Sequence, residues 1–305
     1  MKKVAFSVAA MFALFLFLSC QNAYCDDYKV HLEKVKYYED KCRHKEKAAL
    51  EEAKKAYELN PKDFEANYWL GRTYYDNRMY KDAKVQLEKT LEMNPDDVET
   101  NAHLAYTYGR IGENIVVRTF YMFKSIERIN KVISIDPNYA DVYNSLAIGC
   151  TYLGWYEKPT GVFRKLVQVL FKDEKLVDEF SAEMLYKKAI ALDPNDAWYY
   201  VQLGWLYLKR DRKEDANKVF QKGEDLASKD IKCGMKDDGI LRGIAIYYEE
   251  AGMFAEALEY AKTALAWNPK DLCLEPRLSL KKLIERLEKE KKIGKPLLKN
   301  VADEM

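Results

Sequence analysis

The residues that could do chemistry in this chain are few and far apart. Its three histidines, at positions 31, 44 and 103, spread over more than seventy residues, and its six cysteines form no Cys-x-x-Cys pair. Such spacing indicates neither a histidine metal cage nor a zinc site. The strings typical of phosphate-binding loops, dinucleotide sites, metalloproteases and serine hydrolases do not occur. The sequence therefore predicts a protein that is not an enzyme and that needs no metal or cofactor.

Two tryptophans are the strongest candidates for a binding role. Trp198 and Trp205 stand seven residues apart in an apolar stretch, so a helix would carry both on one face. Large aromatic side chains act as anchors in protein interfaces, where truncating a hot spot costs on the order of 2 kcal/mol or more. The alternative is that a neighbouring element buries both rings as ordinary core.

The composition of the chain indicates what kind of secondary structure must position these residues. Of 305 residues, 48% are hydrophobic and 32% are charged, which allows a sizeable core and argues against wholesale disorder. Only 8 prolines and 13 glycines occur, so a mostly helical chain is expected. Fifty Lys and Arg against 49 Asp and Glu give a net charge of +1, which predicts no global attraction to nucleic acid.

Prolines recur along the chain after helix-like segments that end in Asn or Asp. They are Pro61, Pro95, Pro137, Pro194 and Pro269. A small residue stands twelve positions before each of them: Ala49, Ala83, Ser125, Ala182 and Ala257. Pro61 and Pro95 are 34 residues apart, as are Ala182 and Ala216. This period and these residue types resemble the tetratricopeptide repeat, a helix-turn-helix unit.

The resemblance implies an all-α fold. About five to six helical hairpins would form an α-solenoid over residues 29–269, each hairpin burying its apolar faces against its neighbours. Residues 270–305 would form a C-terminal capping helix and a tail. Intervals longer than the repeat place insertions near residues 112–119, 154–177 and 228–237.

The largest insertion contains an amphipathic stretch. Phe163, Leu166 and Leu170 share one face at helical spacing, which predicts a short helix. Such a helix could fold back to cover the solenoid or close its groove. It could instead contact a partner, a second copy or a membrane surface.

In proteins that the repeat resembles, the first helices of successive hairpins line a concave surface where a peptide or a helix docks. The equivalent positions here predict a partner-binding groove with aromatic anchors and arginines that orient the partner. Its predicted residues are Tyr68, Arg72, Tyr75, Tyr106, Trp198, Trp205 and Arg242.

Residues 1–19 have the layout of a secretory signal. Two lysines precede an apolar run from Val4 to Leu18, which is too short to span a bilayer as a helix. A single disulfide would suit an exported protein, but the sequence does not choose its partners.

The end of this signal resembles the lipobox of bacterial lipoproteins, with Phe17 where an aliphatic residue is usual. That resemblance implies that Cys20 becomes an acylated N-terminus, followed by a tether over residues 20–28. Cleavage after Ala23 or Cys25 without a lipid, or an uncleaved anchor, is the alternative.

The leading hypothesis is a non-catalytic interaction scaffold of the bacterial cell envelope. It would sit on the periplasmic side of a membrane, anchored by lipid, and bind a protein or peptide in its groove. The alternative rests on a weaker resemblance to the lipoprotein component of tripartite periplasmic (TRAP) transporters. It implies a small apolar ligand in a cavity lined by Leu166, Leu170, Trp198 and Trp205. Self-association is compatible with either hypothesis.

Overall fold

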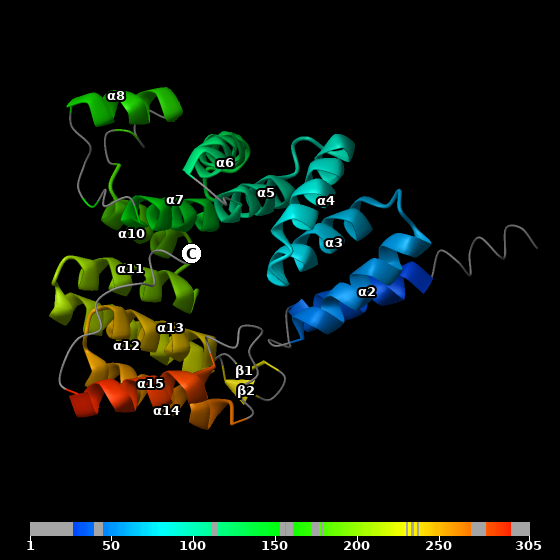
Figure 1. The fold of residues 1–305 in the computed structure, drawn as a ribbon. Coiled ribbons are helices and arrows are strands. Elements are labelled where there is room, and N and C mark those ends of the chain that lie inside the picture. Colours follow the sequence, from blue (N-terminus) through cyan, green and yellow to red (C-terminus); the bar gives the residue numbers. More distant parts are fainter. Residues whose placement is uncertain are drawn as a thin grey trace, which may run out of the picture. The chain divides into compact units, whose positions relative to one another are not determined.

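The computed structural model describes residues 27–39, 45–111, 115–152, 156, 161–171, 177, 180–229, 231–232, 235–236, 238–269 and 279–293. Apart from turns and two short strands, these described residues are helical (Figure 1). The all-α fold that the repeat predicts is confirmed. The chain divides into two compact units, Met1–Ser125 and Ile126–Met305, which are described separately below.

The first unit is a stack of helical hairpins. Its elements are a helix over residues 27–39, α2 (Glu46–Leu59), α3 (Phe64–Asp76), α4 (Tyr80–Met93), α5 (Val98–Arg110) and the N-terminal half of α6 (Ile115–Ile135). Consecutive helices from α2 to α5 pack against each other. The helix over 27–39 already includes residues 27 and 28, so the predicted tether over 20–28 reaches too far.

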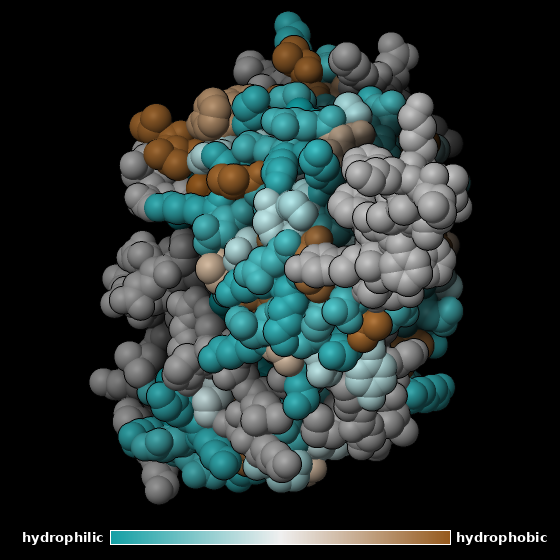
Figure 2. Space-filling view, turned by 90° about the vertical axis from the view of Figure 1, so that its right-hand side faces the viewer, coloured by the Kyte–Doolittle hydropathy of each residue, from teal (hydrophilic) through white to brown (hydrophobic). Residues whose placement is uncertain are grey.

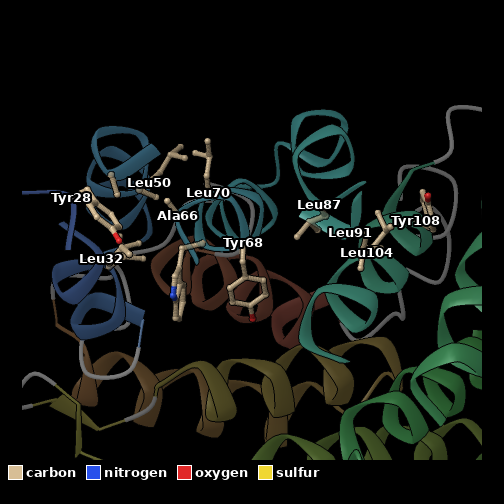
Figure 3. Packing of buried hydrophobic residues seen from close by; sticks show 14 residues of the cluster. Tyr28, Leu32, Leu50, Ala66, Tyr68, Leu70, Leu87, Leu91, Leu104 and Tyr108 are labelled. Atoms are coloured by element: carbon tan, nitrogen blue, oxygen red, sulfur yellow. The ribbon is translucent and has the colours of Figure 1, made fainter. Parts of the chain in front are cut away.

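Apolar side chains between these helices form the core of the first unit. Leu32, Leu50, Leu70 and Leu104 are at most 6% exposed, and each comes from a different helix. Figure 3 shows that Tyr68 and Leu70 leave α3 on opposite sides. The helix therefore contributes buried side chains to this cluster from two of its faces.

The second unit continues with further hairpins and ends in a single helix. Its elements, after the C-terminal half of α6, are α7 (Ala140–Tyr152), α8 (Gly161–Leu170), α10 (Ala182–Leu192), α11 (Ala197–Lys209), α12 (Lys213–Lys229), β1 (Ile231–Lys232), β2 (Met235–Lys236), α13 (Asp238–Glu250), α14 (Phe254–Trp267) and α15 (Leu280–Ile293). The helix pairs are α7 with α10, α11 with α12, and α13 with α14. α15 packs on α14 and buries Leu280, Leu283 and Leu287 to at most 1% exposure, as a capping helix should.

The proline turns owe their recurrence to a repeated set of hydrogen bonds. Asp63 caps the start of α3 by accepting a bond from the Ala66 amide at 2.8 Å, and Asn67 donates to the Pro61 carbonyl at 2.9 Å. Residues 34 positions later form both bonds again at the start of α5. The turn and the helix after it are thus tied into one piece.

Glycine is required where the two helices of a hairpin touch. A Cβ atom on Gly71 would lie 2.7 Å from the Leu87 side chain, and one on Gly204 would lie 2.3 Å from the Phe220 ring. Leu87 and Phe220 are fully buried in these contacts. A small residue on the first helix therefore makes room for a large one on the second.

The turns inside three hairpins share one backbone geometry. Arg78, Asp211 and Gly252 adopt positive φ angles of 62°, 55° and 73°. In each turn, the next residue donates its amide hydrogen to the carbonyl of a tyrosine five positions earlier, at 2.9 Å. This is a Schellman-type end, in which a left-handed residue closes the first helix.

The insertions take three forms. In the segment near 112–119, the residues from 115 onward belong to α6. They make α6 21 residues long, whereas α4, the second helix of the preceding hairpin, has 14. Within 154–177 lies the predicted short helix, α8. The third segment, near 228–237, contains the antiparallel pair β1 and β2, in which Ile231 faces Lys236.

Candidate functional site

The seven residues predicted to line a groove fall into two groups, one in each unit. Tyr68, Arg72, Tyr75 and Tyr106 lie on α3 and α5 in the first unit, and Trp198, Trp205 and Arg242 lie on α11 and α13 in the second. We call these two regions the α3–α5 face and the α11–α13 face. In both, the helices that carry these residues contact each other.

A chain of aromatic rings runs across the α3–α5 face. Tyr68 meets Trp69 edge-on with ring centroids 5.4 Å apart, and meets the His103 ring at 5.6 Å. His103 in turn meets Tyr106 at 5.7 Å. We call these four residues the aromatic row. The Tyr68 hydroxyl donates to Glu99 at 3.3 Å, which fixes the ring between the two helices.

Burial makes His103 a neutral member of this row. Its ring Nδ1 lies 2.9 Å from the Glu99 carbonyl oxygen and 3.5 Å from the Tyr68 hydroxyl. Burial, assisted by the positive charge of Arg72, lowers the pKa of His103 to about 4. Near neutral pH the row therefore contains no charge of its own.

Arg72 lies beside the row, between an aromatic ring and two carboxylates. Its guanidinium stacks over the Trp69 ring at 4.8 Å and forms long ion pairs with Glu39 at 3.9 Å and Asp76 at 4.0 Å. Burial and the Asp76 charge raise the pKa of Glu39 to about 8, and burial raises the pKa of Asp76 to about 6. The two carboxyl groups thus share a proton near neutral pH, and one cation is enough to balance them.

Tyr75 is held at the end of α3 by the following turn and by α5. Its ring lies 5.6 Å from the Tyr80 ring, and burial raises the pKa of its hydroxyl while the Arg110 charge opposes that rise. Tyr75 and Tyr106 are both partly exposed, whereas Tyr68 is only 8% exposed. Of the three predicted tyrosines, two therefore keep surface that a partner could contact.

Trp205 is not an exposed anchor, contrary to the prediction. It is 3% exposed and stacks on Tyr247 of α13 with ring centroids 5.3 Å apart. Its indole nitrogen donates to Glu250 at 3.1 Å, and Lys209 pairs with the same carboxylate at 3.4 Å. The neighbouring hairpin buries this tryptophan, as the alternative interpretation of the sequence holds.

Trp198 keeps part of its surface. The side chain is 37% exposed, and its ring lies against Gly243, where a Cβ atom would come within 2.9 Å of it. Because Gly243 has no side chain, the Trp198 ring can pack closely against α13 at this position. Among the predicted residues of this face, Trp198 alone is exposed.

Arg242 does not orient a partner in this structure, which corrects the prediction. It is 6% exposed and pairs at 2.7 Å with Asp238, which is 2% exposed and also accepts a hydrogen bond from Asn268. A buried ion pair of this kind serves the packing of α13 and the end of α14, since breaking it would leave a buried charge.

The insertion helix is partly buried. Val167 is fully buried, and Asn130 of α6 donates to the Leu170 carbonyl at 2.5 Å, so the end of α8 is joined to the C-terminal half of α6. The side chains of Phe163 and Leu166 lie outside what the structure describes. The cavity of the alternative hypothesis gains no support, because Tyr247 already occupies the space beside Trp205.

The remaining predictions concern the cysteines, membrane spans and metal ligands. Cys20 and the signal segment belong to the undescribed residues, whereas Cys150 is a buried free thiol whose pKa burial raises to about 12. Of the helices that the structure describes, none has the length and apolar character needed to cross a membrane. Within the same residues, no three metal-ligating side chains come together.

His103, Trp69 and Asp76 belong to the α3–α5 face, and Glu39 at the end of the helix over 27–39 pairs with Arg72 there; all four were missed by sequence reasoning. Counting equivalent positions pairs Tyr68 with Ala102, which is fully buried, whereas in space Tyr68 meets Glu99 and His103. Neighbouring first helices thus contact through residues on either side of the counted position, which a position count does not reveal. The aromatic and ionisable character of residues next to the counted positions is the signal that could have found them.

Comparison with family models decides the relationship. Two models of the tetratricopeptide repeat match the chain, one over residues 44–108 and one over residues 185–216. The chain therefore contains tetratricopeptide repeats in these two stretches. Such repeats serve protein–protein contacts, so they support the role of an interaction scaffold. No curated protein matches the chain in sequence.

Solved structures resemble it in fold. TTC0263, a thermophilic tetratricopeptide repeat protein of Thermus thermophilus, is 18% identical over 82% of this chain and 96% of its own, with a TM-score of 0.41. MamA is 20% identical over 59% of this chain and 88% of its own, with a TM-score of 0.36. A chain of the APC/C hetero-tetramer Cut9–Hcn1 is 14% identical over 84% of this chain and 42% of its own, with a TM-score of 0.52. At such identities the likeness concerns the fold alone.

Proposed function

We propose that this protein is a non-catalytic scaffold of the bacterial cell envelope that holds a peptide or helix of a partner protein on its α3–α5 face. The observation that carries the proposal is the aromatic row. Its rings are already locked edge to edge in the free protein, so little side-chain freedom is lost when a partner binds. Tyrosine, tryptophan and arginine are also the side chains enriched at binding hot spots.

The charges around the row suit a partner with an apolar side chain and few charges. Arg72 is engaged by Trp69 and two carboxyl groups, and Lys36 pairs with Glu65 at 2.7 Å. Because Tyr68 and Trp69 are each only 8% exposed, a partner would meet the partly exposed rings of His103 and Tyr106, with paired charges around them. This is the usual arrangement of an interface, with an apolar centre and a polar rim.

The envelope location rests on the N-terminal sequence. Lysines 2 and 3, the apolar run from Val4 to Leu18 and the following Ser19-Cys20 have the order of an export signal that ends in a lipidated cysteine. An acyl chain on Cys20 would hold the repeats at a membrane surface on the periplasmic side.

Partner binding is tested by comparing two tyrosines. The full-length protein with an affinity tag is used to capture partners from its native cells, as wild type, as Tyr106→Ala and as Tyr37→Ala. Tyr37 is the matched control, because it is 55% exposed on the helix over 27–39 and lies outside the aromatic row. We expect a partner that Tyr37→Ala retains and that Tyr106→Ala binds at least about tenfold more weakly. Equal capture by both variants would remove the α3–α5 face from the proposal.

Lipidation is tested separately by intact-mass analysis of the membrane fraction. The expected product starts at Cys20 and carries acyl chains, and Cys20→Ala should move the protein out of the detergent-soluble membrane fraction. A product that starts after residue 23 or 25 without added mass would instead indicate secretion without a lipid.

A further inference from the structure

An apolar stripe lies on the N-terminal half of α6, away from the aromatic row. Val116 is 74% exposed, Phe120 is 57% exposed and Phe123 is 49% exposed. They follow one another at intervals of four and three residues, so they share one face of the helix. Figure 2 shows that most described residues on the face in view are hydrophilic, with hydrophobic ones only in small groups. Two exposed phenylalanines on successive turns therefore need an explanation.

The opposite face of α6 holds this stripe outward. Tyr121 stacks on Tyr108 of α5 with ring centroids 5.5 Å apart, and Ser125 donates to the Ala105 carbonyl at 2.9 Å. Tyr121 and Ser125 stand four residues apart and so mark the face that packs on the first unit. The helix cannot turn to bury Phe120 and Phe123 without losing both contacts.

The same helix has an excess of positive charge in a chain that is almost neutral. α6 contains Arg118, Lys124, Arg128 and Lys131 against the single acid Glu127, a net charge of +3. Glu127 is itself paired with Arg128 at 3.0 Å. Lys124 lies one turn after Phe120 and hence beside the stripe. The surface that complements exposed phenylalanines beside a lysine is both apolar and anionic.

We propose that this face of α6 rests on an anionic phospholipid surface, with Phe120 and Phe123 at the level of the headgroups and Lys124 against their phosphates. A few aromatic side chains and cations are enough for such a peripheral contact. Three side chains on one helix are too few for the roughly 800 Å² per partner that a stable dimer buries. This inference does not depend on the proposed partner site or on acylation of Cys20.

The test places a photo-crosslinking residue, benzoylphenylalanine, at position 120 of the full-length protein mixed with lipid vesicles. The matched control carries the same residue at position 85, because Val85 is 62% exposed on α4 in the same unit but stands alone. We expect phospholipid adducts from position 120 in vesicles that contain phosphatidylglycerol, at least about tenfold above those from position 85. A membrane-embedded N-terminus raises both signals alike, so the ratio still reports on α6.

Charge dependence completes the test. Pure phosphatidylcholine vesicles or the variant Lys124→Glu should lower the adducts from position 120 about fivefold or more. Equal adducts at positions 120 and 85, equal adducts with both kinds of vesicle, or crosslinks from position 120 to a second copy of the chain would each overturn the proposal. Circular dichroism of each variant confirms that it is folded before its adducts are counted.

Discussion

Arg72 and Trp205 occupy the same position of the repeat, directly after a Leu-Gly pair. Their side chains nevertheless have different surroundings in the two units. Arg72 lies over Trp69 between two carboxyl groups, and Tyr75 on the same helix stays partly exposed. Trp205 stacks on Tyr247 and closes the contact between α11 and α13. The repeat thus determines which residues share a face. The side chain offered by the next helix determines whether that face stays open.

The largest expected effect comes from removing the buried member of this pair. Trp205→Ala should destabilise the second unit by about 3–5 kcal/mol, because it empties a fully packed site and leaves Glu250 without its indole donor. Hydrogen exchange of the α11 and α13 amides measures the loss. The matched control is Trp198→Ala, whose ring is 37% exposed and which should lose clearly less. Equal losses would break the distinction between a packed and an open tryptophan.

Much of this architecture could be predicted from the sequence, because the contacts that define each hairpin join residues close together in the chain. The proline spacing marks the hairpins because each Asn-Pro turn is tied to the following helix by bonds from residues only a few positions away. Gly71 and Gly204 mark close helix contacts for a similar reason, since their partners lie sixteen residues on in the same hairpin.

The candidate site was predicted less well because its contacts join different hairpins. Nothing near Trp205 in the sequence announces that Tyr247, more than forty residues later, supplies a flat ring to stack on. Arg242 likewise looks like a surface cation in the sequence, whereas the structure pairs it at 2.7 Å with Asp238, which also accepts a hydrogen bond from Asn268. Residue type alone does not separate an anchor for a partner from an anchor for the fold.

The second prediction concerns the carboxyl pair beside Arg72. The pKa of Glu39 is raised to about 8 and that of Asp76 to about 6, so the folded chain binds more protons than the unfolded chain as pH rises from about 4 to 8. Stability should therefore fall with rising pH across that range. Burial lowers the pKa of His103 to about 4, so the contribution of this residue to stability rises with pH, mainly below about pH 6.5. The interval from pH 6.5 to 8 therefore isolates Glu39.

Glu39→Gln sharpens the comparison of the two faces, because it keeps the buried shape but removes the titration. The variant should gain about 1–2 kcal/mol over wild type between pH 6.5 and 8, as measured by urea unfolding. Glu33→Gln is the control, since the Glu33 side chain is 73% exposed on the same helix. A wild-type stability that stays flat over this interval would show that Arg72 balances two charged carboxylates rather than one.

The smallest expected effect tests what the two units share. Arg78 in the first unit and Asp211 in the second close the same turn with positive φ, a conformation that Gly252 adopts without a side-chain clash. Arg78→Gly should stabilise its unit by about 0.5–1 kcal/mol, and Asp211→Gly by less, because Asp tolerates the left-handed region better than Arg. Gly252→Ala should destabilise by about 1 kcal/mol. Urea unfolding midpoints give all three values, and a loss from Arg78→Gly would mean that the arginine side chain stabilises its hairpin more than its backbone strain opposes it. In that case the side chains at these turns would contribute differently in the two units, as they do on the two faces. The shared backbone geometry alone would then not determine the stability of the turn.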